Sequence, residues 1–226
     1  MCFSAPGSFI LGTALIGSGA YSIRNVKKRE YLPLAITPIL FGIQQLMEGG
    51  VWLALAAQSI ILTRIFALGF VFFAFFLWPA WAPFFSRSIE PVSWRKRMFN
   101  YFMWAGIVFG AFFYILHIFY CNTLNPQVIN HSISYDSQVT ILVRSYQWEL
   151  YLIYFVIVAG PLLLSSLPRI RIFGLLTMIG VAVTVLFFFY AFSSVWCFFA
   201  AIISFYIIWI IKKSNGDITE IKTPEK

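Results

Sequence analysis

The sequence predicts an all-α fold, a bundle of seven transmembrane helices with the N-terminus outside the cell and the C-terminus in the cytoplasm. The 226 residues are 61% hydrophobic and only 11% charged, whereas a soluble domain is about 45–50% apolar and about 25% charged. Seven apolar stretches approach the roughly 20 residues that a helix needs to cross a bilayer. All the Lys and Arg residues except Arg64 and Arg144 fall in alternate loops, and cytoplasmic loops are the ones that retain basic residues.

The apolar stretches are separated by charged or polar loops, with one exception. The stretch 172–211 holds 40 residues without a charge, and as a single helix it would be about 60 Å long, twice the membrane thickness. It therefore has to turn back, and we expect the turn at 191–194. The seven spans are expected at about 3–22, 31–56, 63–85, 98–120, 147–167, 172–190 and 195–211.

These spans predict one membrane domain, residues 1–213, in the plasma or inner membrane. The first span is followed rather than preceded by basic residues, which argues against a cleaved signal peptide. The polar residues 214–226 are expected to form a disordered cytoplasmic tail, and the longest loop, 121–146, is expected outside. The net charge of +8 lies beside apolar spans, so it indicates topology and contact with lipid head groups rather than nucleic acid.

Glu48 is the one carboxylate deep within an expected span. It lies about 26 Å along a helix that starts at the cytoplasmic face near Tyr31, which places it in the outer quarter of the bilayer. An ionisable residue at that depth is costly and indicates a functional site. Gln44, one turn before Glu48, and Gln45 lie on or near the same face. The alternative for Glu48 and for both amides is plain hydrogen bonding between helices.

Two cysteines and a histidine are expected at the same depth. Cys2 and Cys197 open the first and seventh spans at the outer face, and His117 lies about 28 Å along an outward-running helix. Cys121 and Glu149 begin or end neighbouring spans at that face. Five spans thus direct titratable groups to one layer of the membrane.

This set of residues leaves several chemistries open. Cys2, Glu48 and Cys197 could bind a soft or borderline metal such as Zn²⁺ or a copper ion, although no CxxC or HExxH spacing supports one. A thiol beside a carboxylate or imidazole could instead be a nucleophile. A Cys2–Cys197 disulfide at an oxidising outer face is the structural alternative.

Small residues and prolines predict two packing features. The segment from Trp78 to Pro83 contains two prolines, which should bend the third span and free backbone groups that only a packed or watered interior can satisfy. The first span should pack closely against a neighbour, because it carries small residues at short spacings, namely Ser8, Gly12, Thr13, Gly17 and Gly19.

Three blocks of sequence resemble a bacterial family of uncharacterised multi-pass membrane proteins that begin with MCFSA. The blocks are MCFSA at 1–5, LFGIQQLMEG at 40–49 and SVWCFFAA at 194–201. The resemblance implies that Cys2, Glu48 and Cys197 belong to family motifs, and it implies no particular activity.

The sequence therefore predicts a membrane protein that binds a metal ion or a small ligand in the outer half of the bundle. Cys2, Glu48 and Cys197 would bind the metal, and Gln44, Gln45, Glu48 and His117 would contact a ligand. Two alternatives stay open: an intramembrane thiol-dependent enzyme that acts on a lipid, and a non-catalytic scaffold with a Cys2–Cys197 disulfide.

Overall fold

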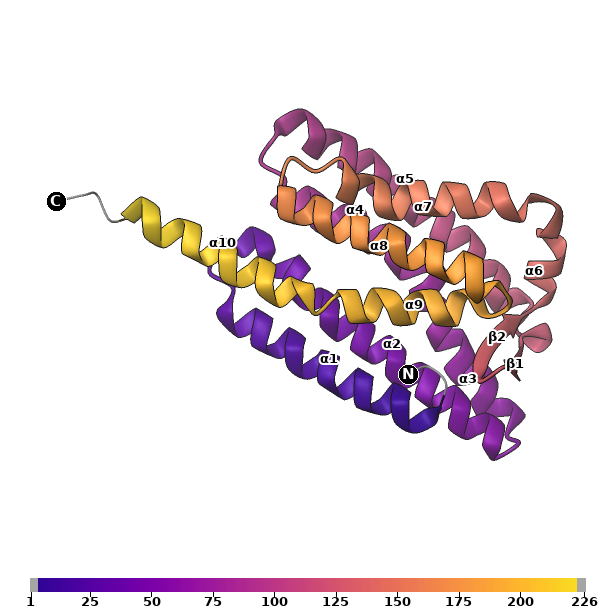
Figure 1. Ribbon diagram of the computed structural model, residues 1–226. Helices are drawn as coiled ribbons and strands as arrows, with labels where there is room; N and C mark the ends of the chain where they lie inside the picture. The colour runs from indigo at the N-terminus through magenta and orange to yellow at the C-terminus, as the bar shows by residue number, and fades with distance from the viewer. Residues whose placement is uncertain (1–3, 223–226) are drawn as a thin grey trace.

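The computed structural model describes residues 4–222, and it is a bundle of helices with one small hairpin (Figure 1). Most helices run roughly parallel or antiparallel to one another along the long dimension of the molecule. The helices are α1 Ala5–Asn25, α2 Leu32–Ala56, α3 Ile60–Val71, α4 Trp78–Ile89, α5 Ser93–Phe119, α6 Gln138–Leu142, α7 Gln147–Leu163, α8 Pro168–Phe187, α9 Phe192–Ile203 and α10 Tyr206–Lys222. The two strands, β1 Asn125–Ile129 and β2 Ser132–Asp136, pair antiparallel.

Six helical segments of the described chain are long and apolar enough to cross a membrane. They match the second to seventh expected spans and are Arg29–Ala56, Ile60–Ile89, Ser93–Phe119, Arg144–Leu163, Pro168–Phe187 and Phe189–Ser214. Large apolar side chains point outward from them, as in Trp104, Phe112 and Leu186, which are 57%, 57% and 74% exposed. The first expected span, α1, is helical over 21 residues but is not among the six, because its serines and glycines make it less apolar. A seventh crossing therefore stays a prediction.

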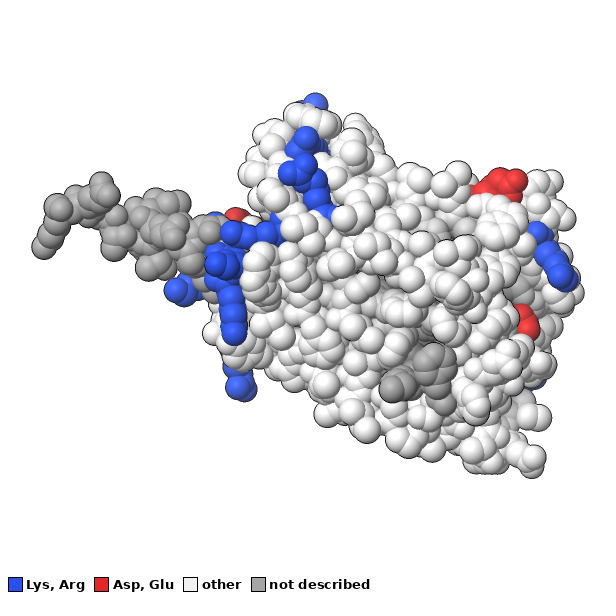
Figure 2. Space-filling view, viewed as in Figure 1, with Lys and Arg blue, Asp and Glu red and all other residues white. Residues whose placement is uncertain are grey.

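The basic side chains gather at one end of the bundle. Figure 2 shows most Lys and Arg at the end from which α10 projects, with few at the end that carries the β-hairpin. The alternate basic loops of the sequence thus meet in space, as a bundle of antiparallel spans requires. Which end faces the cytoplasm stays a prediction from this asymmetry.

Helices α1 and α2 pack with their backbones in near contact. A Cβ atom added to Gly12 would lie 2.9 Å from the carbonyl oxygen of Gly42, and one added to Gly42 would lie 2.7 Å from that of Gly12. A Cβ at Gly19 would lie 2.4 Å from the side chain of Ile39. The expected close packing of the first span is confirmed at these positions, whereas Gly17 faces open space.

A π-helical stretch, Phe72–Leu77, joins α3 to α4 directly before Pro79. The backbone N–H of Trp78 bonds to the carbonyl of Phe73, five residues back, and in this register Pro79 has no N–H to offer the carbonyl of Ala74. The hydroxyl of Tyr154 on α7 donates to that carbonyl at 2.8 Å. The expected irregularity is therefore present, and the protein interior satisfies a backbone group that the proline leaves free.

The segment 121–146, expected as a plain loop, contains the β-hairpin and α6 instead. Asn130 and His131 form its two-residue turn with φ of 46° and 61°, the left-handed conformation that such turns need. The ring of Tyr135 stacks on Phe70 of α3 with centroids 4.4 Å apart. The first four residues of β2 are all buried, so the hairpin packs against this apolar surface, which a sequence-based expectation of loop did not consider.

Two further boundaries differ from expectation. The turn between the last two spans lies at 188–191 rather than 191–194, because α8 ends at Phe187 and α9 already begins at Phe192. Helix α10 continues to Lys222, so the segment expected to be a disordered tail from 214 is helical over its first part. Cys2 lies outside the described residues.

Candidate functional site

Polar side chains on α2 and α9 face each other in the interior of the bundle. Gln44 and Glu48 are one turn apart on α2, and Ser194 and Cys197 are one turn apart on α9, so each pair lies on one helix face. All four side chains are at most 1% exposed. Gln45, beside them on α2, is also fully buried. The polar stripe predicted on α2 therefore faces protein.

A chain of hydrogen bonds joins three helices through Gln44. The indole N–H of Trp78 on α4 donates to Oε1 of Gln44 at 2.8 Å, and Nε2 of Gln44 donates to Sγ of Cys197 at 3.0 Å. An indole N–H can only donate, so it must face the amide oxygen. The amide nitrogen is then directed at the sulfur, which accepts. The ring of Phe41 stacks on Trp78 with centroids 3.8 Å apart and holds the indole in place.

Glu48 makes a second link between α2 and α9. The hydroxyl of Ser194 donates to Oε1 of Glu48. A carboxylate in the middle of a helix has no free backbone N–H nearby, because the helix itself uses them. Its partners must therefore be side chains, and Ser194 on the facing helix supplies one.

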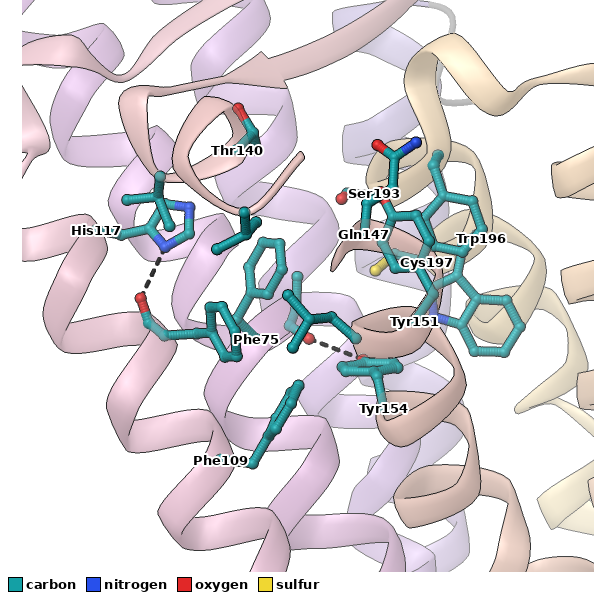
Figure 3. A pocket seen from close by; sticks show the side chains of 16 residues that line it. Phe75, Phe109, His117, Thr140, Gln147, Tyr151, Tyr154, Ser193, Trp196 and Cys197 are labelled. Atoms are coloured by element: carbon teal, nitrogen blue, oxygen red, sulfur yellow. Dashed lines mark hydrogen bonds between the residues drawn. The ribbon is translucent and has the colours of Figure 1, made fainter. Parts of the chain in front are cut away.

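A cavity of about 90 Å³ reaches Cys197 from the side of α5 and α7 (Figure 3). Cys197 and Trp196 lie on one side of it and His117 on the other, with Phe75, Phe109 and Tyr154 among the aromatic residues between them. A larger hollow of about 540 Å³ lies against the hairpin and α6 and shares five lining residues with the cavity. The five are Thr140, Gln147, Tyr151, Phe192 and Ser193. The cavity therefore opens toward the hairpin end of the molecule.

His117 lines this cavity but is not part of the Gln44–Glu48–Cys197 group. Its Nδ1 lies 2.8 Å from the carbonyl oxygen of Phe113 on its own helix, and its ring stacks on Phe75 with centroids 5.0 Å apart. A carbonyl can only accept, so Nδ1 carries a proton. In the neutral form of His117 the lone pair is therefore on Nε2, in the cavity wall.

The convergence of titratable groups expected from sequence is only partial. Within residues 4–222, no group of three His, Cys, Asp or Glu side chains lies close enough to hold a metal ion. Glu149 is exposed and Cys121 lies half-buried in the turn after α5. Within the part of the chain that the structure describes, neither Cys121 nor Cys197 forms a disulfide. Glu149 and Cys121 do not join the buried group, because Glu149 is exposed on α7 and Cys121 lies beyond the end of α5. A metal site or a disulfide with Cys2 stays a prediction.

Several residues of this region were missed by sequence reasoning. Ser194 was considered as part of a turn and of the block 194–201 but was given no role in the site, and Trp78 was considered only as part of a kink. The spacing of Ser194 and Cys197, three residues apart, was the available signal for a shared face. Nothing in the sequence pairs Trp78 with Gln44, because the contact joins separate helices.

A second buried carboxylate, Glu90, lies at the basic end of the bundle. It follows α4, is 2% exposed, and accepts hydrogen bonds from the hydroxyls of Ser165 and Ser166 and from the backbone N–H groups of Ser166 and Val92. Burial alone raises the pKa of a carboxyl group, but the bonds from Ser166, Ser165 and Val92 favour the charged form more strongly. The pKa of Glu90 therefore lies below its usual value of 4.5.

The comparison with known protein families assigns the chain to a family. A model of the family of unknown function DUF6629 matches residues 1–220. The chain belongs to this family. It matches no curated protein and no solved structure. The matched residues include both buried carboxylates, Glu48 and Glu90.

Proposed function

We propose that this DUF6629 protein is a multi-pass protein of the plasma or inner membrane that binds a small ligand in the cavity beside Cys197. The observation that carries the proposal is the junction between the cavity and the buried hydrogen-bond chain. Cys197 lines the cavity and also accepts from Gln44, which Trp78 holds in one orientation. A ligand in the cavity would therefore meet a thiol whose position three helices fix. With the basic end in the cytoplasm, this site lies in the outer half of the membrane.

Each residue of the site would have a separate task. Gln44 positions the thiol, and His117 offers the lone pair of Nε2 from the opposite wall. Glu48, bonded to Ser194 one turn before Cys197, places a carboxyl group on the same side of α9 as the thiol. A Zn²⁺ or copper ion is the alternative ligand, with Cys197 and Glu48 as soft and hard donors. The third donor for such an ion would be Cys2.

Native mass spectrometry tests the proposal on protein purified from cells into lipid nanodiscs. We expect wild-type protein to carry a non-covalent adduct beyond lipid, and Cys197→Ser and Gln44→Leu to lose most of it. Cys121→Ser is the matched control, because Cys121 lies outside the cavity, and it should retain the adduct. Elemental analysis of the same samples separates a metal from an organic ligand.

The same experiment also tests the alternatives. A covalent adduct on Cys197 would favour a thiol-dependent enzyme. An adduct retained in full by both Cys197→Ser and Gln44→Leu, or absent from wild-type protein, would contradict a ligand site at Cys197.

A further inference from the structure

The walls of the cavity change from polar to aromatic along its length. Figure 3 shows Thr140, Gln147 and Ser193 toward the hairpin side, and Phe109 and Tyr154 at the opposite, inner end. The hydroxyl of Tyr154 is engaged by the carbonyl of Ala74, so the inner end presents mainly aromatic surface. A purely polar ligand would lose its hydration there without gaining partners.

The hollow outside the cavity has charges of both signs. Asp136, at the end of β2, and Arg144, in the turn after α6, both line it, together with the polar residues of the rim. A head group that carries a positive and a negative charge would find a partner for each. An apolar end of the same molecule would have the aromatic chamber within reach, because the two spaces share lining residues.

The sizes of the two spaces limit the ligand further. A cavity needs about 10–15 Å³ of volume open to the centre of a water molecule to hold one water. The 90 Å³ cavity therefore takes roughly six to nine water-sized groups. That suits the end of one alkyl chain or a single ring, and it excludes two acyl chains side by side. The hollow of about 540 Å³ is large enough for a head group.

From this arrangement we infer that the ligand is a single-chain zwitterionic amphiphile. Its polar head would lie in the hollow between Asp136 and Arg144, and its apolar end would lie between Phe109, Tyr154 and Trp196, next to the Cys197 thiol. This inference rests on the proposed function, because it assigns a chemical class to the ligand of that cavity. Its entry route is from the hairpin end.

The Cys197 thiol can report occupation of the cavity. In a Cys2→Ser, Cys121→Ser background it is the one remaining cysteine, since the chain has three. The experiment measures its labelling rate by N-ethylmaleimide in phosphatidylcholine nanodiscs, with added decylphosphocholine or with glycerophosphocholine, which has the head group alone. We expect decylphosphocholine at about ten times its Kd to slow labelling about tenfold, since only unoccupied protein reacts. The head group alone should have little effect.

Matched tryptophan variants on α9 show whether the protection arises in the cavity. Ser193→Trp fills the rim, so it should itself slow labelling and remove any further effect of decylphosphocholine. Ile202→Trp is the control, because Ile202 is 43% exposed on the outer face of the same helix and should behave like the parent. If labelling is already slow in phosphatidylcholine nanodiscs without decylphosphocholine but fast in amphipol, a two-chain bilayer lipid protects the thiol, and the single-chain inference is wrong.

Three other outcomes would also overturn the inference. These are no labelling of Cys197 in amphipol, equal protection by glycerophosphocholine, and protection that Ser193→Trp leaves unchanged. An adduct that still depends on Cys197 and Gln44 in the native mass spectrum would then keep the proposed function and reject only the ligand class. Loss of both results would reject the two together.

Discussion

Glu48 and Glu90 are both almost fully buried, yet they are held in different ways. Glu90 lies where α4 ends and accepts from two serine hydroxyls and two backbone N–H groups. Glu48 lies inside α2, where the helix uses the backbone N–H groups, and it bonds to a side chain of the facing helix. A carboxylate at a helix end is thus available for fixing loops. One inside a helix can only join side chains, and Glu48 is linked through Ser194 to the helix whose Cys197 lines the cavity.

These different surroundings predict that Glu90 is mainly structural and Glu48 mainly functional. The largest expected effect is that of a Glu90 substitution on stability. Glu90→Ala leaves four donors, one buried and three half-buried, without their acceptor, and we expect it to lower the free energy of unfolding by about 2–4 kcal/mol. Scanning fluorimetry in detergent would measure it as a lower melting temperature. Glu30→Ala is the matched control, because Glu30 is exposed at the same end of the bundle, and it should change little. Equal melting temperatures for the two variants would contradict the structural role of Glu90.

The acid dependence of stability should also separate Glu90 from other groups. Its pKa in the folded protein is below 4.5, so its contribution is present above the pKa of the unfolded chain and is lost as the pH falls through the folded value. The difference in melting temperature between wild type and Glu90→Gln should therefore be constant near neutral pH and shrink below about pH 4.5. If the difference in melting temperature instead grew as the pH fell, the pKa of Glu90 in the folded protein would be raised rather than lowered.

Charge removal at the two sites should have opposite consequences for ligand binding. Glu48→Gln keeps an oxygen that can accept from Ser194, so we expect it to change stability by less than about 1 kcal/mol while reducing the adduct seen in native mass spectra. Glu90→Gln should retain the adduct and lose stability. Glu48→Leu with unchanged stability and unchanged adduct would show that the Glu48 carboxylate is not part of a site.

The last prediction concerns the orientation of the protein in the membrane, which decides the side nearer to Glu48 and the side nearer to Glu90. The substitutions that test it should change the protein least. In a cysteine-free background, Asn130→Cys at the hairpin turn should react with an impermeant thiol reagent in intact cells. Ser93→Cys at the start of α5 should not react until the membrane is opened. Both positions are exposed, so access to the reagent decides the result. The reverse pattern would place Glu90 outside and Glu48 toward the cytoplasm.

The sequence by itself determined the all-α class, the positions of six apolar helices and the gathering of basic residues at one end. It did so because span length and loop charge are local properties, which each segment carries without its neighbours. It also singled out Gln44, Glu48 and Cys197, since polar residues in apolar helices stand out against their surroundings. It overlooked Glu90, which follows a span within a polar loop and so has no such contrast.

Only the tertiary structure decided which of these residues meet. The bond from Gln44 to Cys197 joins residues 153 positions apart, and the bond from Trp78 fixes its direction. Three other features likewise depend on the rotation of each helix about its own axis. They are the separation of His117 from Glu48, the packing of the hairpin against α3 and the cavity beside Cys197. Rotation is set by close contacts such as Gly12 against Gly42, because packing between two surfaces is a property of the pair and is absent from either sequence segment alone.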